Sequence, residues 1–138
     1  MILKKSKLAT TNYRSNKYKS HKITVDGETF DSKKEYKRFC ELSLLQKAGK
    51  ITDLQRQVKY ELIPAQYESF ERYGKNGKRL KDGKRCVEKS VVYNADFVYK
   101  MDGKTVVEDT KSKATKTKDY IIKRKLLLYI KGIKIHEV

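Results

Sequence analysis

The sequence contains few of the residues that build disulfides, metal cages or membrane spans. Its 138 residues include two cysteines, two histidines, one proline and no tryptophan. Cys40 and Cys86 stand far apart and outside any CxxC or Cys/His cluster, which argues against a disulfide framework or a zinc site and fits a reducing cytoplasm. No apolar run approaches the roughly 20 residues of a membrane-spanning helix. No apolar stretch follows Met1 to Lys5, so we expect neither a signal peptide nor a membrane partner.

Acidic residues are also scarce, because 17 Asp and Glu face 34 Lys and Arg and leave a formal charge of +17. Such an excess repels itself unless a polyanion binds. Nucleic acid is the default partner, since each neutralised phosphate releases counterions. Two other interpretations stay open: a lysine-rich surface that only confers solubility, and a basic arm that binds an acidic protein.

The charge is unevenly distributed along the chain. Residues 1–22 hold seven cations and no acid, and Tyr13 and Tyr18 interrupt the run. We interpret them as a flexible basic arm that follows phosphates through Arg14, Lys17 and Lys19, or as a solubilising tail. Residues 23–138 form the expected single domain. Within it, residues 65–85 are rich in Gly, Lys and Arg and predict a long loop or protruding hairpin that reads DNA or forms a dimer.

The remaining segments alternate between helical and strand patterns. Ser32 and Glu35 form a capping-box pattern at the start of a helix, and Asp102-Gly103 between two β-branched runs predicts a hairpin turn. The order predicts an α/β fold, a central mixed sheet flanked by helices. The expected elements are a short strand at 22–25, a helix at 30–48, strands at 51–63, 86–100 and 105–111, a helix at 117–131, and a last strand from Ile133 to Val138.

The predicted hairpin brings two acids together. A two-residue loop at Asp102-Gly103 pairs Met101 with Lys104, and counting back along both strands places Asp96 opposite Asp109. Alternation then puts Asp96, Asp109 and Lys111 on one face. Opposed carboxylates repel unless a cation lies between them, and oxygen ligands favour Mg²⁺ or Mn²⁺. The alternative is a solvated face on which Asp109 and Lys111 form a surface ion pair.

Glu35 is a third candidate acid, from a different element. On a helix it shares a stripe with Phe39 and Leu42, so its carboxylate is expected to point toward the packed side. The alternative is that Glu35 only completes the capping box with Ser32. Both roles are compatible only if the carboxylate is shared or reoriented.

The ordered set of Glu35, Asp96 and Asp109-Thr110-Lys111, followed by a helix and a strand, resembles the PD-(D/E)xK nuclease superfamily. The stretches Asp31 to Glu35, Tyr93 to Asp96 and Val107 to Lys111 are similar to a phage-encoded family of Holliday-junction-resolvase-like nucleases. The resemblance implies a restriction-endonuclease-like αβββαβ core over residues 30–138. Ala95 stands where the motif has proline, a common departure. Glu108 should point to the other face of the sheet.

The resemblance implies a metal-dependent DNA endonuclease in which Glu35, Asp96, Asp109 and Lys111 are catalytic. Asp96, Asp109, Glu35 and the backbone carbonyl of Thr110 would hold Mg²⁺ or Mn²⁺, which activates water and shields the scissile phosphate. Lys111 would stabilise the negative transition state. A basic strip on and before the last helix would position DNA through phosphate contacts, unless it is only a solvated face; it comprises Lys113, Lys116, Lys118, Lys123 and Arg124.

Substrate and assembly stay open at this point. Branched DNA is one candidate substrate, and a resolvase that cuts two strands symmetrically would be a homodimer. Nicking, end trimming and sequence-specific cutting are others. The main competing function is a non-catalytic nucleic-acid-binding accessory protein, which explains the charge equally well. A phage-encoded enzyme would act in the cytoplasm of the bacterial host.

Overall fold

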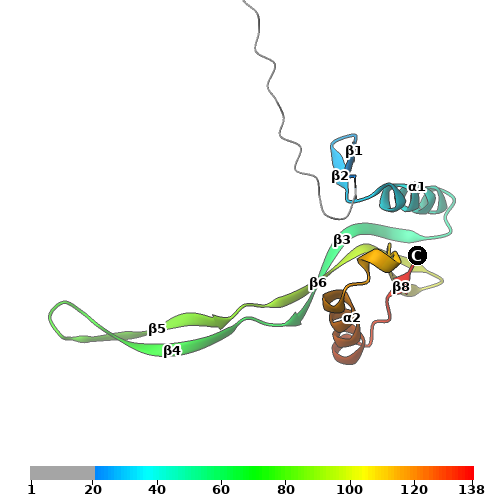
Figure 1. The fold of residues 1–138 in the computed structure, drawn as a ribbon. Coiled ribbons are helices and arrows are strands. Elements are labelled where there is room, and N and C mark those ends of the chain that lie inside the picture. Colours follow the sequence, from blue (N-terminus) through cyan, green and yellow to red (C-terminus); the bar gives the residue numbers. More distant parts are fainter. Residues whose placement is uncertain (1–20) are drawn as a thin grey trace, which may run out of the picture.

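The computed structural model describes residues 21–138. The proposed basic arm, with Arg14, Lys17 and Lys19, therefore lies almost entirely outside the described residues. The described chain is a mixed α/β fold in which helix α1 and helix α2 cover opposite faces of a central sheet (Figure 1). No helix in residues 21–138 is long and apolar enough to cross a membrane.

The central sheet has four strands in the order β3-β6-β7-β8. Strands β3 and β7 both run antiparallel to β6, whereas β8 runs parallel to β7. The predicted mixed sheet and the order α1, β3, β6, β7, α2, β8 are confirmed. The bounds are β3 (Thr52–Ile63), β6 (Val91–Met101), β7 (Lys104–Asp109) and β8 (His136–Glu137).

Helix α1 (Lys33–Lys47) begins at the expected cap, where the Ser32 hydroxyl accepts from the Glu35 N–H at 3.1 Å. Ala48 caps its end, and Gly49 follows with a φ of 72°, as the sequence predicted. The expected helix start at Phe30 was wrong. Phe30 is instead the last residue of β2 (Glu28–Phe30), which pairs with β1 (Ile23–Val25). Its buried ring contacts α1 from outside the helix.

Helix α2 (Lys118–Lys131) follows a short 3₁₀ turn, η1 (Lys113–Thr115). The Thr117 hydroxyl accepts from the Tyr120 N–H, and Gly132 ends the helix with a φ of 65°, as predicted. The last strand is shorter than expected: β8 covers only His136–Glu137, which pair with Glu108 and Asp109. Ile135 instead fills the core under α2.

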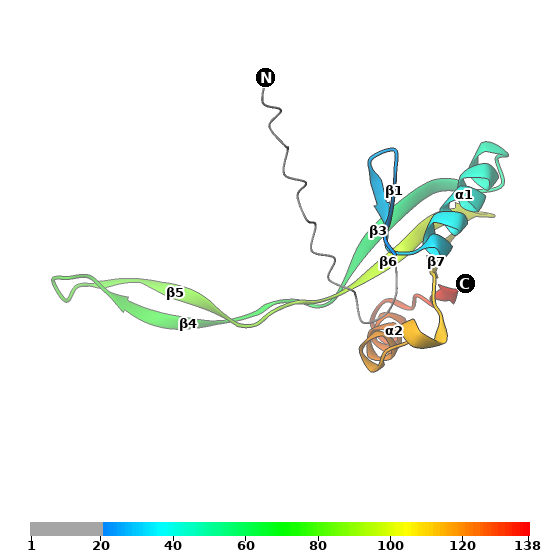
Figure 2. The same ribbon diagram turned by 45° about the horizontal axis from the view of Figure 1, so that its top comes forward.

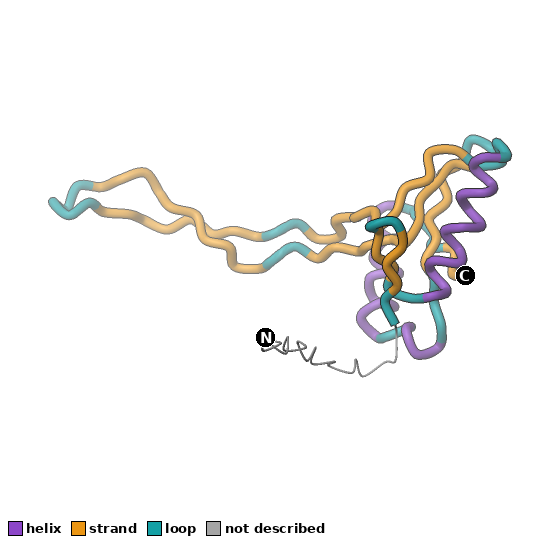
Figure 3. The backbone as a smooth tube through the Cα atoms, turned by 90° about the horizontal axis from the view of Figure 1, so that it is seen from above, coloured by secondary structure: helices purple, strands orange, loops and turns teal. Residues whose placement is uncertain are grey.

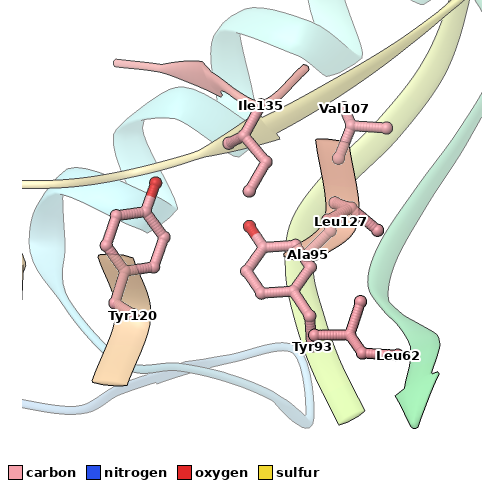
Figure 4. Close-up of a cluster of buried hydrophobic side chains, with 7 residues drawn as sticks. All are labelled: Leu62, Tyr93, Ala95, Val107, Tyr120, Leu127 and Ile135. Carbon is pink, nitrogen blue, oxygen red and sulfur yellow. The ribbon is translucent and has the colours of Figure 1, made fainter. Parts of the chain in front are cut away.

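The core is divided into two clusters of buried side chains, one on each face of the sheet. The cluster on the α1 side contains Leu42, Ile51, Phe97 and Tyr99. The cluster on the α2 side is drawn in Figure 4, where the Tyr93 and Tyr120 rings stand next to each other with centroids 6.4 Å apart. Its buried members are Leu62, Tyr93, Ala95, Val107, Tyr120, Leu127 and Ile135.

The β6–β7 hairpin has the predicted register. Asp102 and Gly103 both have positive φ, at 50° and 73°, which is the geometry of a type I′ turn. Pairing runs from Met101 and Lys104 down to Phe97 and Glu108. Asp96 and Asp109 are the next residues on the two strands, one position beyond the last pair of this ladder.

Strand β6 changes the face of its side chains at Asp96. Tyr93 and Ala95 pack under α2, whereas Phe97 and Tyr99 pack under α1. Strict alternation would place all four residues on one face. The partner position on β3 is Gln57, which lies between the pairs Arg56–Phe97 and Val58–Ala95 and has a φ of 52°. The distortion of both strands at one level lets β6 contribute aromatic side chains to both clusters.

The segment between β3 and β6 forms a long two-stranded hairpin, which we call the arm. Its strands are β4 (Gln66–Tyr73) and β5 (Arg79–Glu88), and it projects away from the sheet and both helices (Figures 2 and 3). The hairpin alternative for residues 65–85 is confirmed. The expected strand at 86–100 was wrong at its start, because Cys86–Glu88 pair within the arm. The pair Ile63–Val91 closes the core at the base of the arm.

Candidate active site

Asp109 lies at the buried end of β7, where its residue is 1% exposed. The Tyr93 hydroxyl donates to its Oδ2 atom at 2.5 Å. The Lys111 Nζ atom lies 3.2 Å from its Oδ1 atom. That Oδ1 atom is buried and accepts no hydrogen bond from the described residues. Asp109 and Lys111 are therefore not the solvated surface pair that the sequence left open.

The surroundings of Asp109 disfavour its charge. Burial raises the pKa of Asp109 to about 7, and hydrogen bonding with Asp96 and the negative charge of Asp96 act in the same direction. The Tyr93 hydroxyl and the Lys111 ammonium oppose this rise. A buried carboxyl group with a perturbed pKa and a second carboxyl beside it is typical of functional sites.

Asp96 is held at this position by the residue that follows Asp109. The Thr110 N–H and hydroxyl both donate to the Asp96 Oδ2 atom, at 2.8 and 2.6 Å. The sequence assigned Thr110 a metal role through its backbone carbonyl, and that role stays a prediction. What the structure adds is that Thr110 orients Asp96 next to Asp109.

Glu35 reaches the same region from the first turn of α1, and its residue is 2% exposed. Its Oε2 atom accepts from the Asp31 N–H at 2.8 Å, and its Oε1 atom lies 3.5 Å from the guanidinium of Arg56. The carboxylate is therefore shared between the helix start and the interior. Burial raises the pKa of Glu35, and the charge of Asp96 adds to the rise, while the Asp31 N–H opposes it.

Gln57 connects the acid on the helix to the acid on the strand. Its Nε2 atom lies 3.1 Å from Glu35 Oε1 and 3.4 Å from Asp96 Oδ1, and its Oε1 atom accepts from the Asn94 amide at 2.5 Å. Its φ of 52° places it in the left-handed region, which is uncommon for a non-glycine residue and clusters at functional sites. The alternating pattern of β3 did not distinguish Gln57 from a glutamine that faces solvent.

Lys111 is fixed by contacts of both its side chain and its backbone. Its ammonium lies 4.4 Å from the centroid of the Tyr120 ring, a cation–π distance, and its N–H donates to the Val138 oxygen at 3.0 Å. The Lys34 ammonium donates to the Lys111 carbonyl at 2.8 Å. The lysine is therefore confined between Asp109 and Tyr120.

Glu108 points to the opposite face of the sheet, as the sequence predicted. Its carboxylate accepts from Arg38 at 2.6 and 2.9 Å and from the Tyr99 hydroxyl at 2.6 Å. Glu108 is 1% exposed, so these donors compensate a buried charge. Burial and Glu108 raise the pKa of Tyr99 to about 12. Glu108 has a structural role that ties β7 to α1.

The donor set fits a divalent cation held by two protein carboxylates. Among residues 21–138, no three His, Cys, Asp or Glu side chains form a group that could hold a metal ion. Asp96 is close enough to raise the pKa of Asp109, and the buried Asp109 Oδ1 atom forms no hydrogen bond with the described residues and faces the Lys111 ammonium at 3.2 Å. Mg²⁺ is commonly bound by one or two carboxylates, with water and substrate phosphates completing its shell.

Cations also lie near Thr110. A cavity of about 220 Å³ adjoins Thr110 and is lined by Lys34, Lys37 and Arg38 together with Glu41 and Val138. The predicted basic strip is partly occupied by internal ion pairs. Glu137 binds Lys116 at 2.5 Å and Arg124 at 2.7 Å, and Asp119 lies 3.7 Å from Lys123. Lys113 and Lys118 are exposed, which leaves them available to a ligand.

A comparison with protein families gives one match, over residues 15–136. The chain belongs to the DUF1064 family. The family is described as proteins of unknown function, and the matched span contains all four candidate catalytic residues. No curated protein and no solved structure matches the chain. Membership of the DUF1064 family assigns no activity, so the function has to be inferred from the site.

Proposed function

We propose that the protein is a metal-dependent endonuclease that hydrolyses phosphodiester bonds in DNA. The observation that carries the proposal is the environment of Asp109. A buried carboxyl group, with a pKa raised to about 7, meets a second carboxyl group, and one of its oxygens has an ion pair with Lys111 but no hydrogen bond. A fold keeps two opposed acids at low dielectric when a cation relieves their repulsion. Lys111 neutralises part of that charge from one side only.

Asp96 and Asp109 would hold Mg²⁺ or Mn²⁺, with the Thr110 carbonyl and Glu35 as further oxygen donors. A divalent ion there supplies Lewis-acid stabilisation of the phosphate and lowers the pKa of the attacking water. The remaining roles belong to side chains that the structure places around the acids. The contacts of Gln57 fix the separation of Glu35 and Asp96. Glu35 is then positioned to orient water beside Asp96.

Lys111 would stabilise the negative charge that develops on the phosphate in the transition state. Its contacts with Asp109 and the Tyr120 ring limit its freedom, so little reorganisation is required when the charge forms. The Lys34 and Lys37 side chains beside Thr110 offer phosphate contacts that position the backbone without reading its sequence. The net charge of +17 supports a polyanionic substrate.

Branched DNA is the substrate that the motif resemblance favours, in phage recombination or replication and in the cytoplasm of a bacterial host. Symmetric cleavage of a four-way junction requires two active sites related by a twofold axis. A homodimer is therefore part of this more specific proposal, and it is tested separately from metal-dependent cleavage.

The test compares the wild type with Asp109→Asn on a four-way junction and on a linear duplex of matched sequence, with Mg²⁺ or with EDTA. We expect cleavage by the wild type with Mg²⁺ only, and a loss on the order of 10² or more in rate for the variant. Asp119→Asn is the matched control, because Asp119 carries the same charge on a side chain that is 81% exposed. The control should cut at the wild-type rate.

Preference for the junction over the duplex would support a resolvase. If wild type, Asp109→Asn and Asp119→Asn all bind DNA tightly and none cuts it, the acids are structural. The protein would then be a non-catalytic nucleic-acid-binding protein, which is the alternative that the overall charge supports equally well.

A further inference from the structure

The arm has no hydrophobic core of its own. Every side chain of β4 is exposed, and of β5 only Gly83 is partly covered. Its apolar residues include Tyr67 at 62%, Phe70 at 42% and Tyr73 at 58% exposure. An isolated two-stranded hairpin is marginally stable in water. Such a segment contributes little to the stability of the fold, and this points to a partner that binds along it.

The charge on the arm identifies the chemistry of that partner. We call residues 72–81 the tip; it carries Arg72, Lys75, Lys78, Arg79 and Lys81 and no acid. The acids that flank the tip, Glu71 and Asp82, both pair with Arg79, and Glu68 pairs with Arg85 nearer the base. Among the ion pairs of the described residues, none involves Arg72, Lys75, Lys78 or Lys81. The tip therefore exposes four cations, Arg72, Lys75, Lys78 and Lys81, that form no ion pair with an acid of the described residues.

This charge argues against a second copy of the chain as the occupant. A twofold contact brings the same patch of both subunits together. Tip-to-tip contact would place the unpaired cations of one subunit close to those of the other, and like charges in contact are repulsive. A polyanion relieves the same charge through counterion release.

The dimensions of the arm fit a DNA groove. Eight residues of strand reach about 27 Å at about 3.4 Å per residue, roughly eight base pairs of duplex. The major groove of B-DNA is about 12 Å wide and admits a two-stranded β-ribbon. The deep, narrow major groove of A-form RNA does not.

We propose that the arm is a second DNA-binding element, whose tip enters the major groove of the duplex that flanks the cleaved bond. Its cations contact the phosphates that border the groove, and Tyr73 and Leu80 supply apolar surface toward the bases. The inference rests on the proposed DNA substrate but not on catalysis. The arm begins at the strand pair Ile63–Val91 and projects from that end of the sheet (Figure 1).

The test measures DNA binding by the full chain in EDTA, so that cleavage plays no part. The tip variant is Lys75→Gln/Lys78→Gln/Lys81→Gln. The matched control is Lys47→Gln/Lys50→Gln/Lys104→Gln, which removes three exposed lysines near the end of the molecule opposite to the arm. For each protein, affinity for a linear B-DNA duplex is measured at several salt concentrations, together with protection of guanine N7 atoms, which lie in the major groove.

We expect the tip variant to lower the slope of log affinity against log salt by up to about 3. It should bind at least about tenfold more weakly at 100 mM salt and lose a patch of N7 protection. The control should keep the protection and most of the slope. On an RNA duplex, the two variants should weaken binding equally.

Equal effects of the two triple variants on the DNA slope, or unchanged N7 protection in the tip variant, would overturn the inference. A tip variant that changes the sedimentation coefficient of the free protein but not its DNA binding would assign the arm to a dimer instead. If the wild type binds DNA but does not cut it with Mg²⁺, the nuclease proposal fails while the arm remains testable. If the wild type binds no DNA, both proposals fail.

Discussion

Asp109 sits at the end of a buried strand, between the Tyr93 hydroxyl and the Asp96 carboxyl group. Its environment favours the neutral form of the acid. A hydrophobic side chain at this position would avoid the cost of burying a carboxyl group. Local rules fail together at this point, since Gln57 on the facing strand also has a left-handed backbone. Such coincidences are expected where function is maintained at the expense of stability.

The stability of the metal-free protein should fall as Asp109 ionises. Its pKa is about 7 in the folded state against 3.8 for an unperturbed aspartic acid, so the folded state binds the proton more tightly than the unfolded chain. The resulting stability is fully present below about pH 4 and is lost as the pH rises through about 7. Asp109→Asn removes the titration, and should stabilise the metal-free protein at pH 8 by up to about 4 kcal/mol relative to its effect at pH 4.

Urea unfolding in EDTA at pH 4, 6 and 8 measures this difference. The exposed substitution Asp119→Asn should shift the free energy of unfolding by the same small amount at all three pH values. A constant offset between wild type and Asp109→Asn across the series would show that burial of Asp109 does not oppose its ionisation.

The sequence alone predicted some residues of the candidate site and not others. Asp96, Asp109 and Lys111 were found because a two-residue Asp-Gly turn fixes the register of the hairpin that carries them. Gln57 was considered as a polar neighbour of the acids, but a solvent-facing glutamine was favoured. Its strand is joined to β6 by the whole arm, and no short turn sets that register. Tyr93 was also missed, since its position in a run of core residues gave no sign that its hydroxyl meets Asp109.

Helix α1 connects the stability of an element to the geometry of the site. The Ser32 hydroxyl accepts from the backbone of Glu35, and the Glu35 carboxylate accepts in turn from the Asp31 N–H. Helix α2 has a comparable cap, in which the Thr117 hydroxyl accepts from the Tyr120 N–H. The two caps allow a matched comparison, because only the first one holds a candidate catalytic acid.

Ser32→Ala and Thr117→Ala should each lower the free energy of unfolding by about 1 kcal/mol. Ser32→Ala should also reduce the cleavage rate several-fold, because fraying of the first turn releases Glu35, whereas Ser32→Thr should retain both properties. Chemical denaturation and initial cleavage rates test the pair. If Ser32→Ala loses as much stability as Thr117→Ala but cleaves at the wild-type rate, the cap has no effect on the site.

Within the arm, Gly83 has a steric role. A Cβ atom there would lie 2.5 Å from the Phe70 ring and 2.8 Å from Arg72, and Phe70 and Gly83 are register partners. The ring thus covers the exposed backbone of the facing strand. Gly83→Ala should loosen the arm and leave the core unchanged, since the two share no buried side chains.

Amide hydrogen exchange tests this at the level of the element. Gly83→Ala should accelerate exchange in residues 66–88 and leave protection in α1, β6 and α2 as in the wild type. The double variant Gly83→Ala/Phe70→Ala should recover part of the lost protection, because the main clash is removed. Uniform acceleration across arm and core would contradict a local role for Gly83.

The boundaries of the elements were predicted best where a cap or a turn defines them. Thr117, Gly132 and Asp102-Gly103 each have a local signature, and the structure agrees. The start of β6 was wrong because the apolar pattern of the arm runs into Val91 without a marked break. The length of β8 was wrong because a parallel strand is limited by its partner, and β7 ends at Asp109.

On the scale of the whole molecule, the arm is an extension of a hairpin that the core can close without it. Ile63 and Val91 already pair at its base. Replacing residues 65–89 with a short Gly-containing turn should therefore leave the melting temperature within a few degrees of the wild-type value. Circular dichroism and thermal unfolding measure this, and a molten or aggregated product would show that the arm is required for the core.

The arm also bears on the order in which the chain folds. Strands β3 and β6 are far apart in sequence, so their pairing alone would require closure of a long loop, which slows folding. The turn between Tyr73 and Arg79 is local, and pairing can spread from it along β4 and β5 toward the base. When it arrives there, Ile63 and Val91 are already neighbours, and the central pair of the sheet forms as the continuation of a hairpin.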